Sequence, residues 1–290
     1  MLPNFFIAGA PKAGTTTLYR YLGEHRDVFM SNVKEPNFFS YDQIVEQKLY
    51  YSEKGISTQG AYEKIFEKVG LEKAVGEASV SYFFYKQVPL KIHSCIPDAK
   101  IILILRSPVE RSFSHYLMDL RLGYINHSFE DIVYKQIIHP MLILYYQQFI
   151  ELGFYYEHVK RYFDVFGEQN VKVFLHDDLE NNARQIFAEL CDFLGIYFND
   201  RVDFTKKYNV YKTPRNKIFK FLYSIKKCRQ LTHAIIPNFM INNVKNWLLI
   251  SGNKPKLSEI TRKYLNDLYK KNIYQTGKLI RRDLSGWCND

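Results

Sequence analysis

The hydrophobic pattern of the chain alternates between short apolar runs and longer segments with helical spacing. Short apolar runs are typical of buried parallel strands; they lie at 5–8, 28–30, 74–78, 100–105 and 170–175. Helical spacing fills the intervals, at 15–22, 62–69, 85–96, 155–166, 183–194 and 258–276. The third run is expected to extend to about residue 82. Strands that alternate with helices predict an α/β fold, in which helices flank a central parallel sheet in three layers.

A turn of small residues, Gly9–Gly14, joins the first expected strand to the first expected helix. The first amides of a helix have no intrahelical partner, so the strand, turn and helix together predict an anion-binding cradle. Lys12 adds a positive charge to this cradle, and Thr15–Thr17 add hydroxyl donors. An ordinary strand-to-helix turn with a solvated lysine is the alternative interpretation.

The two glycines have the spacing of a nucleotide-binding P-loop, which predicts a P-loop-like fold. Thr15, however, stands where that motif has its lysine, and the lysine of this chain is inside the turn at position 12. An ATPase or GTPase needs a lysine on the β- and γ-phosphates and a hydroxyl on Mg²⁺. The altered spacing therefore favours a shorter anion and calls for no metal.

A second anion motif follows the most apolar run, 100–105, which ends in Arg106-Ser107-Pro108. A P-loop NTPase would place an aspartate for Mg²⁺ here. A guanidinium at the carboxyl end of a strand suits a phosphate, because it can bind two oxygens at once. Ser114 lies eight residues further on, in the next expected helix.

Together, the two motifs resemble those of the sulfotransferases that use 3′-phosphoadenosine 5′-phosphosulfate (PAPS), most of all the bacterial and heparan-sulfate-type branch. The resemblance implies PAPS as donor and 3′-phosphoadenosine 5′-phosphate (PAP) as product, with no metal. It implies that Arg106 and Ser114 hold the 3′-phosphate. It also implies a 5′-phosphosulfate site formed by Lys12, Ala13, Gly14, Thr15, Thr16 and Thr17.

The catalytic base that the resemblance implies is Glu35, within Lys34-Glu35-Pro36, while Lys12 would offset charge on the leaving phosphate. Because Pro36 disfavours helix at the residue before it, Glu35 is expected to be extended. Glu77 is the second candidate for the base, or else a structural carboxylate. Heparan-type relatives have a lysine at the position of Ala78, and its replacement argues against a highly anionic acceptor.

The chain carries a net charge of +10, which indicates an anionic partner or simply serves solubility. No RNA-binding signature is present, so a nucleic-acid partner is not expected. A basic amphipathic segment, 215–229, is expected to cover the acceptor cleft, to lie on a membrane surface or to form a solvated helix face. It belongs to a variable acceptor-side or lid region at about 204–257.

The cysteines show no C-x-x-C pairing, which favours reduced thiols in a cytoplasmic protein. They are Cys95, Cys191, Cys228 and Cys288. The first expected strand begins four residues from Met1, so no signal peptide is expected, and no apolar run is long enough to span a membrane.

We therefore expect residues 1–290 to form a single sulfotransferase domain that transfers a sulfuryl group to a hydroxyl. A glycan acceptor is favoured by the resemblance, and a lipid or small-molecule alcohol is the alternative. From other functional classes, a P-loop small-molecule kinase and a nucleic-acid-binding module remain as hypotheses.

Overall fold

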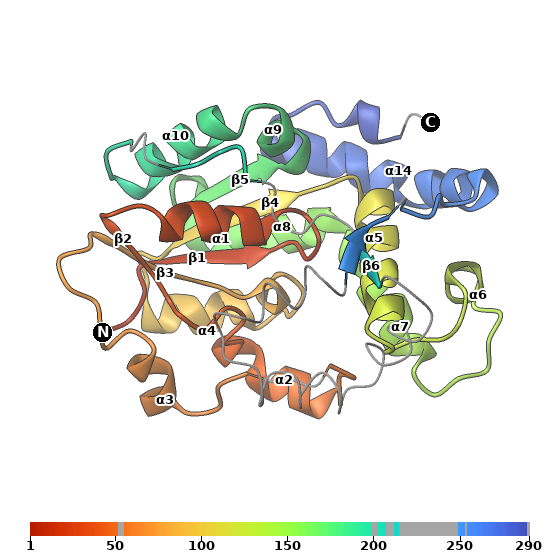
Figure 1. The fold of residues 1–290 in the computed structure, drawn as a ribbon, viewed down its shortest axis with the longest axis horizontal. Coiled ribbons are helices and arrows are strands. Elements are labelled where there is room, and N and C mark those ends of the chain that lie inside the picture. Colours follow the sequence, from red (N-terminus) through yellow and green to blue (C-terminus); the bar gives the residue numbers. More distant parts are fainter. Residues whose placement is uncertain (52–54, 199–201, 207–211, 215–248, 253, 289–290) are drawn as a thin grey trace.

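The computed structural model describes residues 1–51, 55–198, 202–206, 212–214, 249–252 and 254–288. Within them, five parallel strands form one sheet in the order β2-β3-β1-β4-β5, which confirms the predicted α/β architecture (Figure 1). The strands are β1 (Phe5–Gly9), β2 (Val28–Met30), β3 (Ala74–Ala78), β4 (Lys100–Leu105) and β5 (Val171–Leu175).

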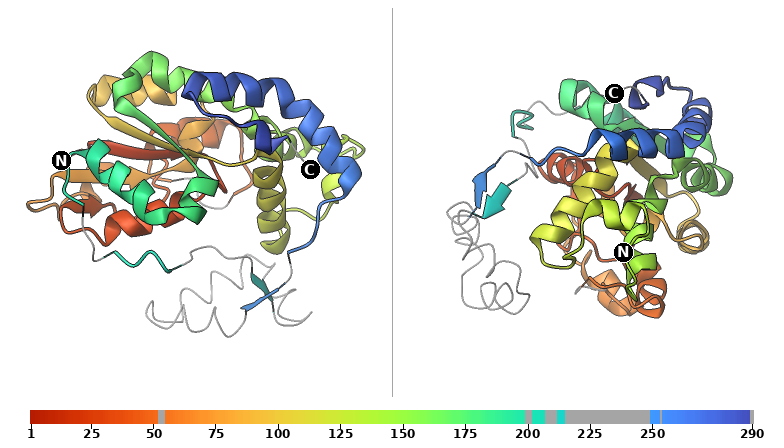
Figure 2. Two further views of the ribbon diagram at one scale, coloured as in Figure 1. Left: turned by 90° about the horizontal axis from the view of Figure 1, so that it is seen from above. Right: turned by 90° about the vertical axis from the view of Figure 1, so that its right-hand side faces the viewer.

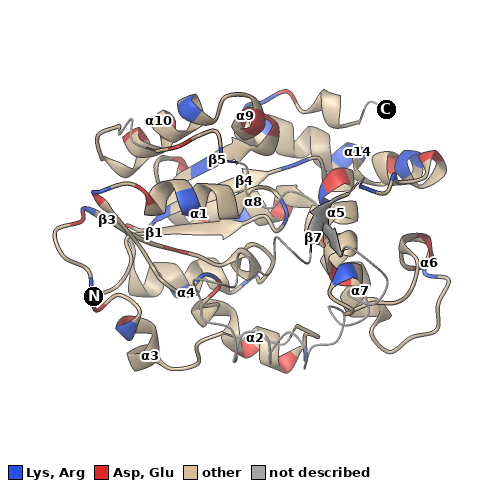
Figure 3. Cartoon of the chain, viewed as in Figure 1, with Lys and Arg blue, Asp and Glu red and all other residues tan. Residues whose placement is uncertain are grey.

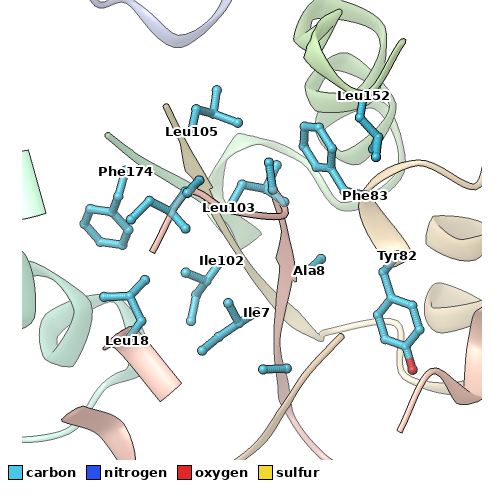
Figure 4. Close-up of a cluster of buried hydrophobic side chains, with 14 of the residues drawn as sticks. Ile7, Ala8, Leu18, Tyr82, Phe83, Ile102, Leu103, Leu105, Leu152 and Phe174 are labelled. Carbon is cyan, nitrogen blue, oxygen red and sulfur yellow. The ribbon is translucent and has the colours of Figure 1, made fainter. Parts of the chain in front are cut away.

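The central strands are apolar because helices cover both faces of the sheet. Ile7 of β1 pairs with Ala78 of β3 on one side and with Ile102 of β4 on the other. Figure 4 shows Leu18 beside Ile7 and Ile102, with Phe83 across the sheet. All of these side chains are fully buried, so the sheet forms the centre of the hydrophobic core.

Helices form a layer on each face of the sheet (Figure 2). One layer contains α1 (Thr15–Gly23), α9 (His176–Asn181) and α10 (Ala183–Leu194). The other contains α4 (Val88–Cys95), α8 (Tyr155–Phe166) and α14 (Glu259–Ile280). This arrangement confirms the three layers that the alternation of strands and helices predicts.

The carboxyl ends of the strands face α5 (Pro108–Arg121), which begins just after β4. The remaining α-helices are α2 (Tyr41–Glu46), α3 (Gln59–Lys64), α6 (Phe129–Val133) and α7 (Leu142–Phe149). Short 3-10 turns are η1 (Phe38–Ser40), η2 (Val80–Phe83), η3 (Glu151–Gly153), η4 (Glu168–Asn170) and η5 (Ser285–Trp287). Two further strands, β6 (Lys212–Pro214) and β7 (Leu249–Ser251), pair antiparallel.

Several predicted boundaries are wrong. The third strand ends at Ala78 rather than near residue 82, because the Ser79 N–H makes the last bond to β1, and a 3-10 turn follows. The fourth helix begins at Val88 rather than 85, since Pro89 fits only the first turn of a helix. The last helix continues to Ile280, and α9 was not predicted. The 215–229 segment and most of the 204–257 region lie outside the described residues.

Charged residues are spread over many elements, and both signs occur along α14 (Figure 3). In the part of the chain that the structure describes, no helix combines the length and apolarity needed to cross a bilayer.

Candidate active site

The turn between β1 and α1 is shaped by glycines. Gly9 and Gly14 have φ values of 146° and 110°, a region that other residues rarely adopt. A Cβ at Gly14 would lie 3.2 Å from Leu179 Cδ2 and 3.3 Å from Ile104 Cδ1. The first hydrogen bonds of α1 run from Thr17 and Leu18 to the Gly14 carbonyl. The amides of residues 15 and 16 therefore have no intrahelical acceptor, as an anion-binding helix end requires.

All of the predicted 5′-phosphosulfate residues lie in this turn or in the first turn of α1. Ala13 and Thr15 are buried, whereas Thr16 and Thr17 are half-buried. The side chains differ in exposure, but the backbone of all four follows the same turn into the helix. The arrangement of donors in this turn therefore comes mainly from the backbone.

Lys12 lies in the same turn, in a left-handed conformation with φ of 66°. Its Nζ is 3.7 Å from Met118 Sδ on α5. Burial and, to a smaller extent, the charges of Arg121, Arg106 and Lys34 together lower the pKa of Lys12 to about 8, although the charge of Asp119 opposes them. Neighbouring cations that lower the pKa of Lys12 repel its protonated form, and this repulsion favours the binding of an anion beside them.

Arg106 reaches the same turn from the carboxyl end of β4. Its Nη1 lies 3.4 Å from the Lys12 carbonyl oxygen, and its own carbonyl accepts a hydrogen bond of 2.8 Å from the Tyr155 hydroxyl. Ser114 is half-buried on α5. It lies four residues before Met118, so the two share the helix face that approaches Lys12. The structure thus joins Arg106 to the turn between β1 and α1 and places Ser114 on the helix facing that turn.

Glu35 does not have the extended backbone that its position before proline predicts, because its φ is 64°. Tertiary contacts hold it in place: its N–H donates to the Ala78 carbonyl, and its Oε2 accepts from the Val80 N–H, at 2.9 and 2.8 Å. Lys34 Nζ is 2.5 Å from its Oε1. These bonds override the local preference and fix the carboxylate at the carboxyl end of β3, next to β1.

Glu77, the second candidate for the base, is fully buried in β3. Its Oε1 accepts hydrogen bonds from the hydroxyls of Tyr62 and Tyr82, at 2.9 and 2.7 Å, and its Oε2 accepts one from Ser79 at 2.9 Å. Burial raises its pKa to about 7 against the effect of these donors. A carboxyl enclosed by three hydroxyls serves the packing of β3, which supports the structural alternative.

A second buried carboxyl beside the turn, Asp119 of α5, was not predicted from the sequence; it has no exposed surface. Tyr50 and Tyr51 donate to its Oδ2 at 2.5 and 2.9 Å. The Tyr51 hydroxyl also lies 2.6 Å from His115 Nε2. No motif marks these residues; the only local signal is the spacing of four between His115 and Asp119, which places them on one helix face.

A further group of possible ligand atoms belongs to His176, Asp177 and Glu180, which lie within 4.8 Å of one another at the start of α9. Asp177 also accepts a hydrogen bond of 3.2 Å from Trp287 Nε1, which ties it to the C-terminal turn. This group therefore has a structural use, and the expectation that the reaction needs no metal stays a prediction.

Comparison with known proteins gives the family of this chain. A family model described as a sulfotransferase domain matches residues 2–277. The chain is 27% identical over 209 residues to a Drosophila melanogaster bifunctional heparan sulfate N-deacetylase/N-sulfotransferase; the match covers 67% of the chain and 20% of that protein. It is 25% identical over 194 residues to human heparan sulfate glucosamine 3-O-sulfotransferase 6; this match covers 67% of the chain and 52% of that protein.

A solved structure resembles the chain over its whole length. The crystal structure of a sulfotransferase from Alicyclobacillus acidocaldarius matches with a TM-score of 0.73 and 28% identity, over 100% of both chains. The chain spans only about a fifth to a half of the two curated relatives named above. Because the sulfotransferase family model matches nearly all of its length, the chain belongs to the sulfotransferase domain family.

Proposed function

We propose that this protein transfers a sulfuryl group from PAPS to a hydroxyl group of a glycan. One observation carries the proposal: Lys12 and Arg106 meet at the Gly9–Gly14 turn, here called the phosphate turn, and the Glu35 carboxylate is fixed at the end of the neighbouring strand pair. Carboxyl ends of adjacent parallel strands lie at one edge of the sheet, where ligands of such folds bind. A cationic donor site and a basic carboxylate therefore share one edge.

The donor would lie across this edge, with its 5′ end on the turn and its 3′-phosphate toward Arg106 and Ser114. The turn contributes the free amides at the start of α1 and the hydroxyls of Thr16 and Thr17. These donors are fixed before the donor arrives, so they stabilise developing charge without reorganising.

In the transfer step, the acceptor oxygen forms a bond to sulfur while the bond from sulfur to the phosphate oxygen breaks. Glu35 takes the proton of the acceptor hydroxyl, and the electron pair of the broken bond stays on the leaving PAP. Lys12 offsets the charge on that oxygen. Glu35 suits a base because its carboxylate is fixed and accessible. One oxygen accepts from the Val80 N–H, the other is paired with Lys34, and the Glu35 side chain is 30% exposed.

A glycan acceptor is supported by the two curated relatives, whose names describe heparan sulfate sulfotransferases. Ala78 is buried at the end of β3, so the position of the relatives' lysine offers no cation to an acidic sugar. Sulfation of a lipid or small-molecule alcohol is the alternative, and contact of 215–229 with a membrane remains part of that alternative.

The decisive experiment incubates the protein with PAPS labelled in the sulfuryl group and a panel of glycans, lipids and small alcohols. Label in a glycan, with release of PAP and no need for Mg²⁺, is the expected result. Label in a lipid or small alcohol alone would refute the glycan assignment. Mg²⁺-dependent consumption of ATP, with no transfer from PAPS, would favour the kinase hypothesis instead.

A further inference from the structure

A buried polar network lies beside the phosphate turn and has no role in the reaction described above. It contains Asp119 and His115 of α5 together with Tyr50 and Tyr51, which follow α2 in the chain. Arg111, also fully buried on α5, donates to the carbonyls of Gln148 and Phe149 at the end of α7. Three segments that are distant in the sequence thus meet around one carboxyl group.

The network ends beside Lys12. Met118, the residue before Asp119, is the contact of the Lys12 ammonium, at 3.7 Å from Nζ to Sδ. A thioether is a weak acceptor for a group with three N–H donors. Asp119 Oδ1 is buried and has no hydrogen-bond donor among the described residues. The turn therefore holds a poorly matched cation, and the adjacent helix holds a carboxylate oxygen in need of a donor.

We propose that Asp119 is a positioning residue for sulfuryl transfer: its carboxylate, held by Tyr50 and Tyr51, is the counter-charge that keeps Lys12 protonated and directed toward the donor. The role rests on the proposed function, since it acts through Lys12. Asp119 touches neither donor nor acceptor.

The charges around this pair explain why a counter-charge is needed. Lys12 faces Arg121 of α5, Arg106 at the end of β4 and Lys34 after β2, all of which disfavour its protonated form. Asp119 is the group that favours that form.

Asp119 itself is enclosed by groups from every element around it. Tyr50 and Tyr51 donate to it, and Lys12 supplies the opposite charge. Burial and, to a smaller extent, the charge of Asp119 raise the pKa of Tyr145 of α7. His115 reaches it through Tyr51. Burial raises the pKa of Asp119 to about 7, and the two tyrosines and Lys12 oppose that rise.

The protonation state of Asp119 has a spectroscopic signature in His115. When Asp119 is ionised, Tyr51 donates to Asp119 and His115 Nε2–H donates to Tyr51. When Asp119 is protonated, it donates to Tyr51, which then donates to Nε2, and Nδ1–H donates to the Gln148 carbonyl at 3.1 Å. The tautomer of His115 therefore reports whether Asp119 carries its charge.

The test measures the titration of Lys12 in the free protein, by NMR of the carbon next to its ammonium group, with Lys12→Arg used to assign the signal. We expect Asp119→Asn to lower the pKa of Lys12 by about one unit, the smallest effect typical of a nearby opposite charge. The basic limb of the pH–rate profile should move down by the same amount. Asp164→Asn, on the exposed face of α8, is the matched control and should leave both unchanged.

A second variant, Tyr50→Phe, removes one donor of the Asp119 carboxylate and keeps the Tyr51 hydroxyl that links Asp119 to His115. It should raise the pH at which the His115 ring signals change tautomer, because a carboxylate with fewer donors has a higher pKa, and it should lower the Lys12 pKa by less than Asp119→Asn does. If Asp119→Asn folds but leaves the Lys12 titration unchanged, the proposal is overturned. If Asp119→Asn does not fold, an unchanged Lys12 pKa in Tyr50→Phe, despite a shifted His115 signal, overturns it as well.

Failure of the proposed function and failure of the role of Asp119 give different experimental results. Lack of PAP binding by wild type, with the expected shift of the Lys12 pKa, would refute the proposed function and leave the coupling between Asp119 and Lys12 intact. Normal Lys12-dependent PAP binding, with a Lys12 pKa insensitive to Asp119→Asn, would refute only the role of Asp119.

Discussion

Replacing Glu77 with glutamine tests whether this buried carboxyl serves the fold or the reaction. Burial raises the pKa of Glu77 from 4.5 to about 7, although three hydroxyls donate to it. Between these two pH values, the folded protein keeps a proton on Glu77 that the unfolded chain has released. Stability must therefore fall as the pH rises through this interval, because the unfolded state binds fewer protons.

The size of this effect follows from the shift. A rise from 4.5 to about 7, at about 1.4 kcal/mol for each unit, corresponds to about 3 kcal/mol of unfolding free energy. The contribution of Glu77 is fully present below pH 4.5 and is lost above pH 7. Glutamine has no ionised form, and its amide can accept from the two tyrosines and donate to Ser79. Glu77→Gln should therefore match wild type near pH 4.5 and exceed it by about 3 kcal/mol at pH 8.

The assay is urea unfolding of wild type and Glu77→Gln at intervals from pH 4.5 to pH 8.5. The difference in unfolding free energy should grow with pH up to about pH 7 and then level off. Glu157→Gln, at an exposed position on α8, is the control, with a difference expected to stay flat. A constant difference between wild type and Glu77→Gln would refute the linkage argument. Loss of sulfuryl transfer in a stable Glu77→Gln would show that the wrong carboxylate was assigned as base.

Three further predictions concern the site and its support. Glu35→Gln should reduce sulfuryl transfer about 10²- to 10⁴-fold, the usual contribution of a general base, with PAP affinity unchanged in calorimetry. Lys12→Ala and Arg106→Ala should each weaken PAP binding by about 1.5 to 3 kcal/mol, as for hydrogen bonds to charged groups, with a smaller loss at high salt. Gly14→Ala should lower the unfolding free energy by about 1 to 3 kcal/mol, because its φ of 110° strains a side chain.

Each of these predictions has its own control. Asp42→Asn, an exposed ion-pair partner on α2, should behave as wild type in transfer and PAP binding. Near-normal turnover of Glu35→Gln would remove the base from the mechanism. PAP binding that survives neutralisation of both Lys12 and Arg106 would remove the donor site. Gly60→Ala, where a Cβ would meet nothing within 4 Å, controls for the change of glycine to alanine, and an equal loss there would show that strain at Gly14 is not the cause.

The features that were predicted correctly are those whose determining residues are contiguous in the sequence. The residue ranges of α8 and α10 were predicted without error, because each has several turns of apolar spacing and a glycine just after its end. The six-residue α9 was missed because it starts directly after β5 and is too short to show a period. The turn between β1 and α1 was predicted for the same reason as the long helices, since all of its determinants lie within one short stretch; its binding of phosphate stays a prediction.

The parts of the site that were missed depend on contacts between distant segments. Glu35 has a left-handed backbone because its two backbone partners, Ala78 at the end of β3 and Val80 at the start of η2, are more than 40 residues away in sequence. The distance between Tyr50 and Asp119 in sequence is 69 residues. No local propensity carries this information, because only the folded sheet and α5 bring these groups together.

The charges of the site likewise come partly from one contiguous stretch and partly from distant segments. Local sequence places Lys12 in a turn of free amides, and the sheet then adds Arg106, while α5 adds Arg121. Each addition makes the free site less favourable for a protonated lysine and more favourable for an anion. A bound donor with several negative charges would relieve this repulsion and raise the pKa of Lys12 above about 8, its value in the free protein. Donor binding should therefore take up a proton at pH values above 8, and its affinity should fall as the pH rises further, because more of the free protein has then lost that proton.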